Sequence, residues 1–230
     1  MICSLCGGKH VIFSTNEQGE DIASPCSCLA ESKAESAIKI QEQKGTLIVQ
    51  PHYLEKFEYA GQDKESKDAL LQRIPTIRKL WLYGGPKTQK TSFAILILKK
   101  LAGMGKQVDY ISMGDLNRII YSAGAFSRDE NTEKLKYYRE AAVLIIDDVY
   151  ADKYVTFSTG TQNTYWSDFV DSRRNPTIFV SQYHPANPPD NWKGALLDID
   201  SMEIVGFHYS NIDDMPNISV PRKRKIVNAG

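Results

Sequence analysis

The sequence lacks an excess of charge, long apolar runs and an N-terminal signal. Its 230 residues carry 28 Lys and Arg against 28 Asp and Glu, which excludes a polycation that binds nucleic acid through bulk charge. The longest apolar stretches, 93–98 and 141–146, fall far short of the ~18–20 residues of a membrane span. No charged region followed by an apolar core opens the chain, so we expect a cytoplasmic protein without a membrane partner.

Cysteine is absent after residue 28. The four cysteines are Cys3, Cys6, Cys26 and Cys28, with the spacing C-x2-C, nineteen residues, C-x-C. Since a disulfide-stapled secreted protein would spread its cysteines or carry a signal peptide, two close pairs favour a tetrahedral zinc site. A module of about 30 residues buries too little apolar surface to fold alone, so a bound metal would stabilise it. The alternatives are four free or redox-active thiols, or His10 in place of one cysteine ligand.

The segments that follow indicate how the chain is organised. Residues 10–21 predict a β-hairpin with a polar tip at Asn16–Gly19. Residues 29–44 are rich in Ala, Glu, Lys and Gln without Pro or Gly, which predicts a solvated helix that acts as a linker. The expected division is a zinc-binding module over 1–30, a helical linker over 31–50, a main domain over 51–215 and a basic tail over 216–230.

Strand and helix patterns alternate in the main domain, after a short helix expected over 64–73. The expected strands are 79–83, 107–113, 141–149, 177–182 and 203–209, and the expected helices are 91–101, 114–123, 130–140, 161–173 and 191–197. The strand over 141–149 is almost continuously apolar, as in parallel sheets that are covered on both faces. Alternation implies right-handed crossovers, and therefore a three-layer α/β sandwich with a mostly parallel sheet of about five strands.

A glycine-containing segment, Gly84–Ser92, lies between the first strand and the first helix of this sheet. It matches the phosphate-loop pattern G-x-x-x-x-G-K-[ST] at Gly84, Lys90 and Thr91. In such a loop the backbone N–H groups and the helix N-terminus bind the phosphates, the lysine reaches the outer phosphates, and the hydroxyl binds Mg²⁺. The sequence therefore predicts a site for ATP and Mg²⁺.

Two positions of the loop depart from the pattern. Gln89 stands where Gly is expected, and Lys87 stands where the related G-P-P-G-T-G-K-T form has Gly. Glycine matters there because the loop needs unusual backbone angles and a close approach to phosphate. The residues expected to bind the nucleotide are Gly84, Gly85, Thr88, Lys90, Thr91, Ser92 and Asp147.

Two carboxylates end the apolar strand that follows, in Val143–Asp148. A strand of this kind, about 55 residues after the loop, predicts the second half of a P-loop ATPase site. Asp147 would hold Mg²⁺ through water, together with Thr91, and Asp148 would orient the attacking water. Either motif alone could be a strand end with a turn or an acidic helix cap, but their order along one sheet favours the ATPase site.

These motifs resemble a family. LYGGPKTQKTSFA followed by VLIIDDV is similar to the AAA+ ATPases of the DnaC/DnaI type, which load the replicative helicase in bacteria and phages and are related to the ATP-binding subunits of insertion-sequence transposition. The double Asp and the short chain, which has no room for a C-terminal helical lid, agree with this group. CSLCGG…SPCSC resembles the zinc-bearing, helicase-binding module of several loaders.

The resemblance assigns roles to further residues. Gln182 takes the place of the polar sensor residue, with Ser181 beside it, although both could simply cap a strand. Ile199 replaces the trans-acting arginine, which is typically worth 10³–10⁵ in rate. Lys193, Arg173 or Arg174 could substitute from a neighbouring subunit. With Gln89, this departure predicts ATP binding with slow hydrolysis.

The resemblance also implies partners: a replicative helicase, further copies of the chain and single-stranded DNA. The candidate DNA contacts are Arg118, Arg128 and Lys134–Lys136, with a basic tail at Arg222–Lys225 that could instead be a solvated terminus. Two other functions stay open: a nucleotide-binding adaptor or inhibitor without catalysis, and a transposition-associated regulator that binds duplex DNA.

Overall fold

The computed structural model describes residues 3–47, 64–126, 129–151, 160–192 and 199–207, which form a two-stranded and a five-stranded sheet. Among these residues no helix is both long and apolar enough to cross a membrane. The expectations for Arg128, Lys193 and 222–225 lie outside the described residues, as do the domain boundaries expected at 51 and 215.

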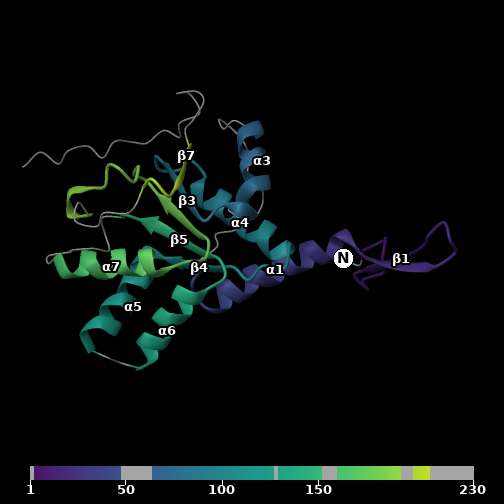
Figure 1. The fold of residues 1–230 in the computed structure, drawn as a ribbon, viewed down its shortest axis with the longest axis horizontal. Coiled ribbons are helices and arrows are strands. Elements are labelled where there is room, and N and C mark those ends of the chain that lie inside the picture. Colours follow the sequence, from purple (N-terminus) through teal and green to yellow (C-terminus); the bar gives the residue numbers. More distant parts are fainter. Residues whose placement is uncertain (1–2, 48–63, 127–128, 152–159, 193–198, 208–230) are drawn as a thin grey trace, which may run out of the picture.

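The N-terminal hairpin is confirmed. Strands β1 (Val11–Thr15) and β2 (Asp21–Pro25) pair antiparallel. The side chain of Asn16 closes the turn, because its Oδ1 accepts hydrogen bonds from the backbone N–H groups of Gln18 and Glu20 at 3.0 and 2.8 Å. In Figure 1 the hairpin lies at the far end of helix α1 from the five-stranded sheet.

The expected helix after the hairpin is confirmed as α1 (Ser27–Gln43), but it is not solvated on all sides. One side packs along α4 (Lys90–Gly103) and buries Ile38 and Gln41. The two helices approach closely at one point: a Cβ atom added to Gly103 would lie 3.2 Å from the carbonyl oxygen of Ala30. The helix is therefore docked along one side and not solvated all round, because a few apolar residues in a polar helix are enough to dock it where a partner surface is available.

The main sheet is parallel throughout and has the strand order β4-β5-β6-β3-β7. All five strands fall within a few residues of the expected ranges: β3 (Lys79–Gly84), β4 (Asp109–Ser112), β5 (Leu144–Val149), β6 (Thr177–Ser181) and β7 (Glu203–Phe207). Since parallel strands end at the same edge, the loop after β3, the carboxylates of β5 and the end of β6 come together there.

Helices cover both faces of this sheet, so the three-layer α/β sandwich is confirmed (Figure 1). One face packs against α1, α3 (Lys64–Arg73) and α4 through a core that includes Leu82, Ile145 and Val180. The other face packs against α5 (Met113–Phe126), α6 (Asp129–Glu140) and α7 (Gly160–Ser172) around Trp81 and Phe179. Of the helix expected over 191–197, the structure describes only a 3₁₀ turn, Asp190–Trp192; the rest lies outside the described residues.

Candidate nucleotide and metal sites

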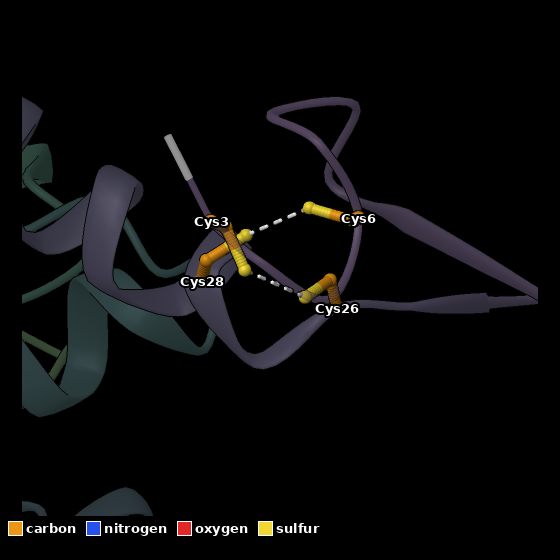
Figure 2. Close-up of side chains that lie close together, drawn as sticks. All are labelled: Cys3, Cys6, Cys26 and Cys28. Atoms are coloured by element: carbon orange, nitrogen blue, oxygen red, sulfur yellow. Dashed lines mark hydrogen bonds between the residues drawn. The ribbon is translucent and has the colours of Figure 1, made fainter. Parts of the chain in front are cut away.

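The four cysteine thiols form one cluster between the start of the chain and the start of α1. Their sulfur atoms all lie within 4.8 Å of one another, with 3.7 Å between Cys3 and Cys26 and 3.4 Å between Cys6 and Cys28 (Figure 2). Four sulfurs at the Zn–S distance of about 2.3 Å in a tetrahedron lie about 3.8 Å apart. The donor set therefore fits Zn²⁺ in both chemistry and spacing.

The environment of the cluster favours the thiolate form of Cys6. Burial alone would raise the pKa of Cys6, but hydrogen bonds from Cys28 and from the His10 backbone outweigh it and hold that pKa at about 6. The same bond with Cys6, together with burial, raises the pKa of Cys28. His10 lies beside the group of four thiols, with Nδ1 3.4 Å from the Cys28 sulfur.

The phosphate-loop segment curls around the N-terminus of α4. Lys90 is 8% exposed, and its ammonium donates hydrogen bonds to the Gly85 carbonyl oxygen at 2.7 Å and to Thr88 Oγ1 at 3.2 Å. Thr88 Oγ1 in turn donates to the Gly85 carbonyl at 2.8 Å. Burial lowers the pKa of Lys90 to about 8, against the opposing charges of two aspartates. A desolvated cation whose hydrogen-bond partners are neutral oxygens gains most from an anion that enters the loop.

The two departures from the loop pattern keep the backbone shape that glycine would supply. Lys87 has φ 63° and Gln89 has φ 64°, both in the left-handed region that L-residues disfavour. Gly84 leaves no room for a side chain, since a Cβ atom there would lie 2.2 Å from the Phe207 carbonyl oxygen. The loop geometry therefore tolerates both substitutions at a cost in backbone strain.

The carboxylates at the end of β5 have different environments. Asp147 is buried, and its Oδ1 accepts the backbone N–H of Asp148 at 2.7 Å, while the side chain of Thr91 also hydrogen-bonds to it. Burial raises the pKa of Asp147, and the hydrogen bond from the Tyr110 hydroxyl opposes that rise. Asp148 is exposed and has φ 57°. A hydroxyl and a carboxylate side by side are oxygen ligands of the kind that Mg²⁺ takes.

The residues at the end of β6 differ in what they can contact. Ser181 is 1% exposed and donates to the Val149 carbonyl at 2.7 Å, while its oxygen accepts the backbone N–H of Tyr183 at 3.0 Å. Its hydroxyl is thus committed to joining β5 and β6. Gln182 is exposed at the edge where the loop and the carboxylates lie, so of the two it is the residue whose side chain is open to a ligand.

Arg173 is a structural residue. It is 1% exposed, and its guanidinium donates to five oxygens: Thr177 Oγ1 and the carbonyls of Tyr138, Arg139, Ala141 and Pro176. The expectation that it substitutes for the missing trans-acting arginine is wrong, because a neighbouring subunit cannot reach it. Arg174 is exposed, so it stays a candidate to replace the trans-acting arginine.

The candidate DNA contacts that are described lie on two adjacent helices. Arg118 on α5 is 76% exposed and pairs with Asp115 at 2.8 Å. Lys134 on α6 pairs with Glu130 at 2.5 Å, and Lys136 is exposed. Ion pairs as exposed as these contribute little to stability, so both side chains could turn to a phosphate at small cost.

Comparison with known proteins identifies the fold. No family model and no curated protein matches the chain. Among solved structures, the DnaC helicase loader is 16% identical with a TM-score of 0.55, and the match covers 69% of this chain and 100% of that one. The chain has the fold of the P-loop AAA+ proteins. Domain III of the Thermotoga maritima replication initiation protein DnaA is 19% identical with a TM-score of 0.52, covering 70% and 69%.

A replication initiator DnaA bound to AMPPCP and single-stranded DNA also shares this fold, at 16% identity and a TM-score of 0.52. The match covers 70% of this chain and 51% of that one, so the chain spans about half the length of this initiator. At these identities the likeness establishes the fold of the core alone, in which the loop that contains Gly84–Gln89 connects β3 to α4.

The sequence did not indicate Tyr110 as part of the site. It lies on β4, and its hydroxyl donates a hydrogen bond to Asp147. Only the pairing of β4 with β5 brings the two together, and a sequence alone does not establish which strands are neighbours. The signal that could have found it is a tyrosine near the end of a strand in an otherwise apolar sheet, since a buried phenol needs a hydrogen-bond partner.

Proposed function

We propose that the chain is an ATP-dependent loader of a replicative DNA helicase. The AAA+ core would bind Mg·ATP at the loop before α4, and the cysteine module would hold Zn²⁺ and bind the helicase. The observation that carries the nucleotide part is the buried Lys90 ammonium, which lies inside a loop of neutral oxygens within the electrostatic reach of Asp147 and Asp148. The fold shared with the DnaC loader supports the assignment to replication.

Each residue has a role in this proposal. Lys90 and the N-terminus of α4 would bind the outer phosphates, and Thr91 with Asp147 would hold Mg²⁺, which neutralises phosphate charge. Asp148 and Gln182 would orient the attacking water. Zn²⁺ at Cys3, Cys6, Cys26 and Cys28 would be structural, because four protein ligands leave no open position for chemistry.

Hydrolysis should be slow. By the resemblance of the sequence, Ile199 takes the place of the trans-acting arginine, and Arg173 is buried with its guanidinium bonded to five oxygens. The same two features favour a second candidate, a nucleotide-binding adaptor or inhibitor that binds the helicase without hydrolysing ATP. In both cases we expect the protein to contact DNA chiefly through the helicase, in an oligomer that forms on it.

The first test compares Lys90→Ala with Lys106→Ala, an exposed lysine just beyond the other end of α4. Mg·ATP binding is measured by calorimetry, and capture of the replicative helicase from the native host is measured with and without ATP. We expect Lys90→Ala to abolish nucleotide binding and the ATP dependence of helicase capture, with Lys106→Ala unchanged. Capture that is the same with and without ATP in the wild type and survives in Lys90→Ala would favour the adaptor, and a wild-type protein that does not bind Mg·ATP would refute the nucleotide site.

A second test concerns the cysteine cluster. Purified protein should contain one zinc per chain, which a chromogenic chelator releases when the thiols are modified. Cys26→Ser should lose the metal and the capture of the helicase, while Mg·ATP binding by the core remains. Protein with all four thiols titratable and no bound metal would refute the zinc site.

A further inference from the structure

Tyr110 reaches the candidate Mg²⁺ site from the neighbouring strand. It is 5% exposed and lies on the face of the sheet that α4 covers. In the register of β4 and β5 it stands beside Ile145, so Asp147 is its diagonal neighbour two residues further along β5 on the same face. Diagonal neighbours lie within reach of an aromatic side chain, and the Tyr110 hydroxyl donates a hydrogen bond to Asp147 Oδ2.

This bond completes the set that holds the Asp147 carboxylate. Oδ2 accepts the Tyr110 hydroxyl, Oδ1 accepts the backbone N–H of Asp148 at 2.7 Å, and Thr91 supplies a further side-chain hydrogen bond. A carboxylate with a donor on each oxygen has one orientation, and its remaining lone pairs point in fixed directions.

Tyr110 is itself fixed from the other side. β4 is an edge strand of the sheet, so its outer backbone groups lack a strand partner. The side-chain amide of Gln41, which is 3% exposed on α1, supplies one: its Oε1 accepts the Tyr110 N–H at 3.2 Å, and its Nε2 donates to the Val108 carbonyl at 3.1 Å. The backbone that carries the tyrosine is therefore clamped.

We propose that Tyr110 is a positioning residue that orients Asp147 toward the Mg²⁺ of the bound nucleotide. The inference rests on the proposed nucleotide function and adds a residue to it. Tyr110 makes no contact with nucleotide or metal in this role; it acts through the Asp147 carboxylate. Outer partners of a direct metal ligand typically change metal affinity by about 10–100-fold when they are removed. We expect the lower end of that range because Asp147 would hold Mg²⁺ through water and because two other donors to Asp147 remain.

The structure provides a control at Asp109, the residue before Tyr110 on β4, which accepts a hydrogen bond from a tyrosine of α6. Tyr137 also donates its hydroxyl to an aspartate, Asp109 Oδ1 at 2.6 Å, but away from Asp147. Tyr110→Phe and Tyr137→Phe thus remove the same chemical group from the same type of bond. Tyr137 also accepts a hydrogen bond from Lys44, just after α1, at 2.8 Å, so Tyr137→Phe tests the loss of a tyrosine hydroxyl at β4 and α1 without the link to Asp147.

The experiment measures the binding of a fluorescent ATP analogue to the full chain as Mg²⁺ is titrated, and again in EDTA. We expect Tyr110→Phe to raise the half-saturating Mg²⁺ concentration about tenfold, with binding in EDTA and the melting temperature unchanged. Tyr137→Phe should match the wild type. In an Asp147→Asn background, Tyr110→Phe should have no further effect, since its route to the metal is gone.

The outcomes separate the two proposals. Wild-type protein without Mg²⁺-dependent binding overturns the proposed function, and this inference with it. Wild-type binding with an unchanged Mg²⁺ requirement in Tyr110→Phe overturns this inference alone. An equal shift in Tyr137→Phe, or a full effect of Tyr110→Phe in the Asp147→Asn background, assigns Tyr110 a purely structural role and also overturns it.

Discussion

Replacing Gln89 with glycine tests whether the loop stores backbone strain. Gln89 caps the N-terminus of α4 with φ 64° and ψ 19°, in the left-handed region. Its side chain makes no capping hydrogen bond, and it is only half-buried. Gln89→Gly therefore removes a strained conformation without removing a bond to the cap.

The expected gain is the difference between two effects. Holding an L-residue in the left-handed region costs about 1–2 kcal/mol. Glycine, in return, gives the unfolded chain more freedom, which costs about 0.4–1 kcal/mol. The free energy of unfolding should therefore rise by about 0.5–1 kcal/mol in Gln89→Gly, equivalent to about 1–4 °C in melting temperature for a chain of this length.

The assay is urea denaturation followed by circular dichroism, supported by thermal melts. Lys106→Gly provides the control, because Lys106 is exposed in the turn after α4 and has no positive φ. There glycine brings only its unfolded-state cost, so the midpoint should fall. The reasoning is refuted if Gln89→Gly lowers the midpoint as Lys106→Gly does, since the left-handed conformation would then cost nothing.

Three other predictions follow from packing and charge. Gly103→Leu should destabilise the protein by about 1–3 kcal/mol through overpacking against Ala30, measured by urea unfolding; an unchanged midpoint would contradict the close docking of α1. Arg173→Leu should cost about 2–4 kcal/mol by leaving buried carbonyls unpaired, and a stable variant that lost only ATPase activity would contradict its structural role. The pKa of Lys90 is about 8, and a bound phosphate favours its charged form. Nucleotide affinity should therefore fall about tenfold from pH 7 to pH 9, where the lysine must take up a proton when the nucleotide binds. Calorimetry that finds no pH dependence of the affinity would contradict this.

Local patterns in the sequence were sufficient for the core of the fold. The apolar run that becomes β5 and the loop between β3 and α4 are contiguous in the chain, so composition and spacing predicted them. The parallel sheet then implied that the loop and Asp147 meet at one edge. The spacing of the cysteines predicted a cluster in the same way, because two tight pairs on a hairpin have few ways to meet.

The parts that the sequence did not predict depend on contacts between distant segments. Gln41 reads as one polar residue in a polar helix, and its burial follows only from the free edge of β4, about 68 residues away. Arg173 reads as one of two arginines before a proline, yet three of its carbonyl partners come from the last turn of α6 and the residue that follows it. Neither partner surface exists until the sheet has assembled.

Helix α1 begins inside the cysteine cluster and ends on the edge of the sheet. Cys26 is its N-cap and Cys28 lies in its first turn, whereas Gln41 holds its last turn to β4. Seventeen helical residues make a rigid rod about 25 Å long. Because α1 packs along α4 as far as Ala30, two residues from Cys28, this rod ties the position of the cysteine cluster to the core.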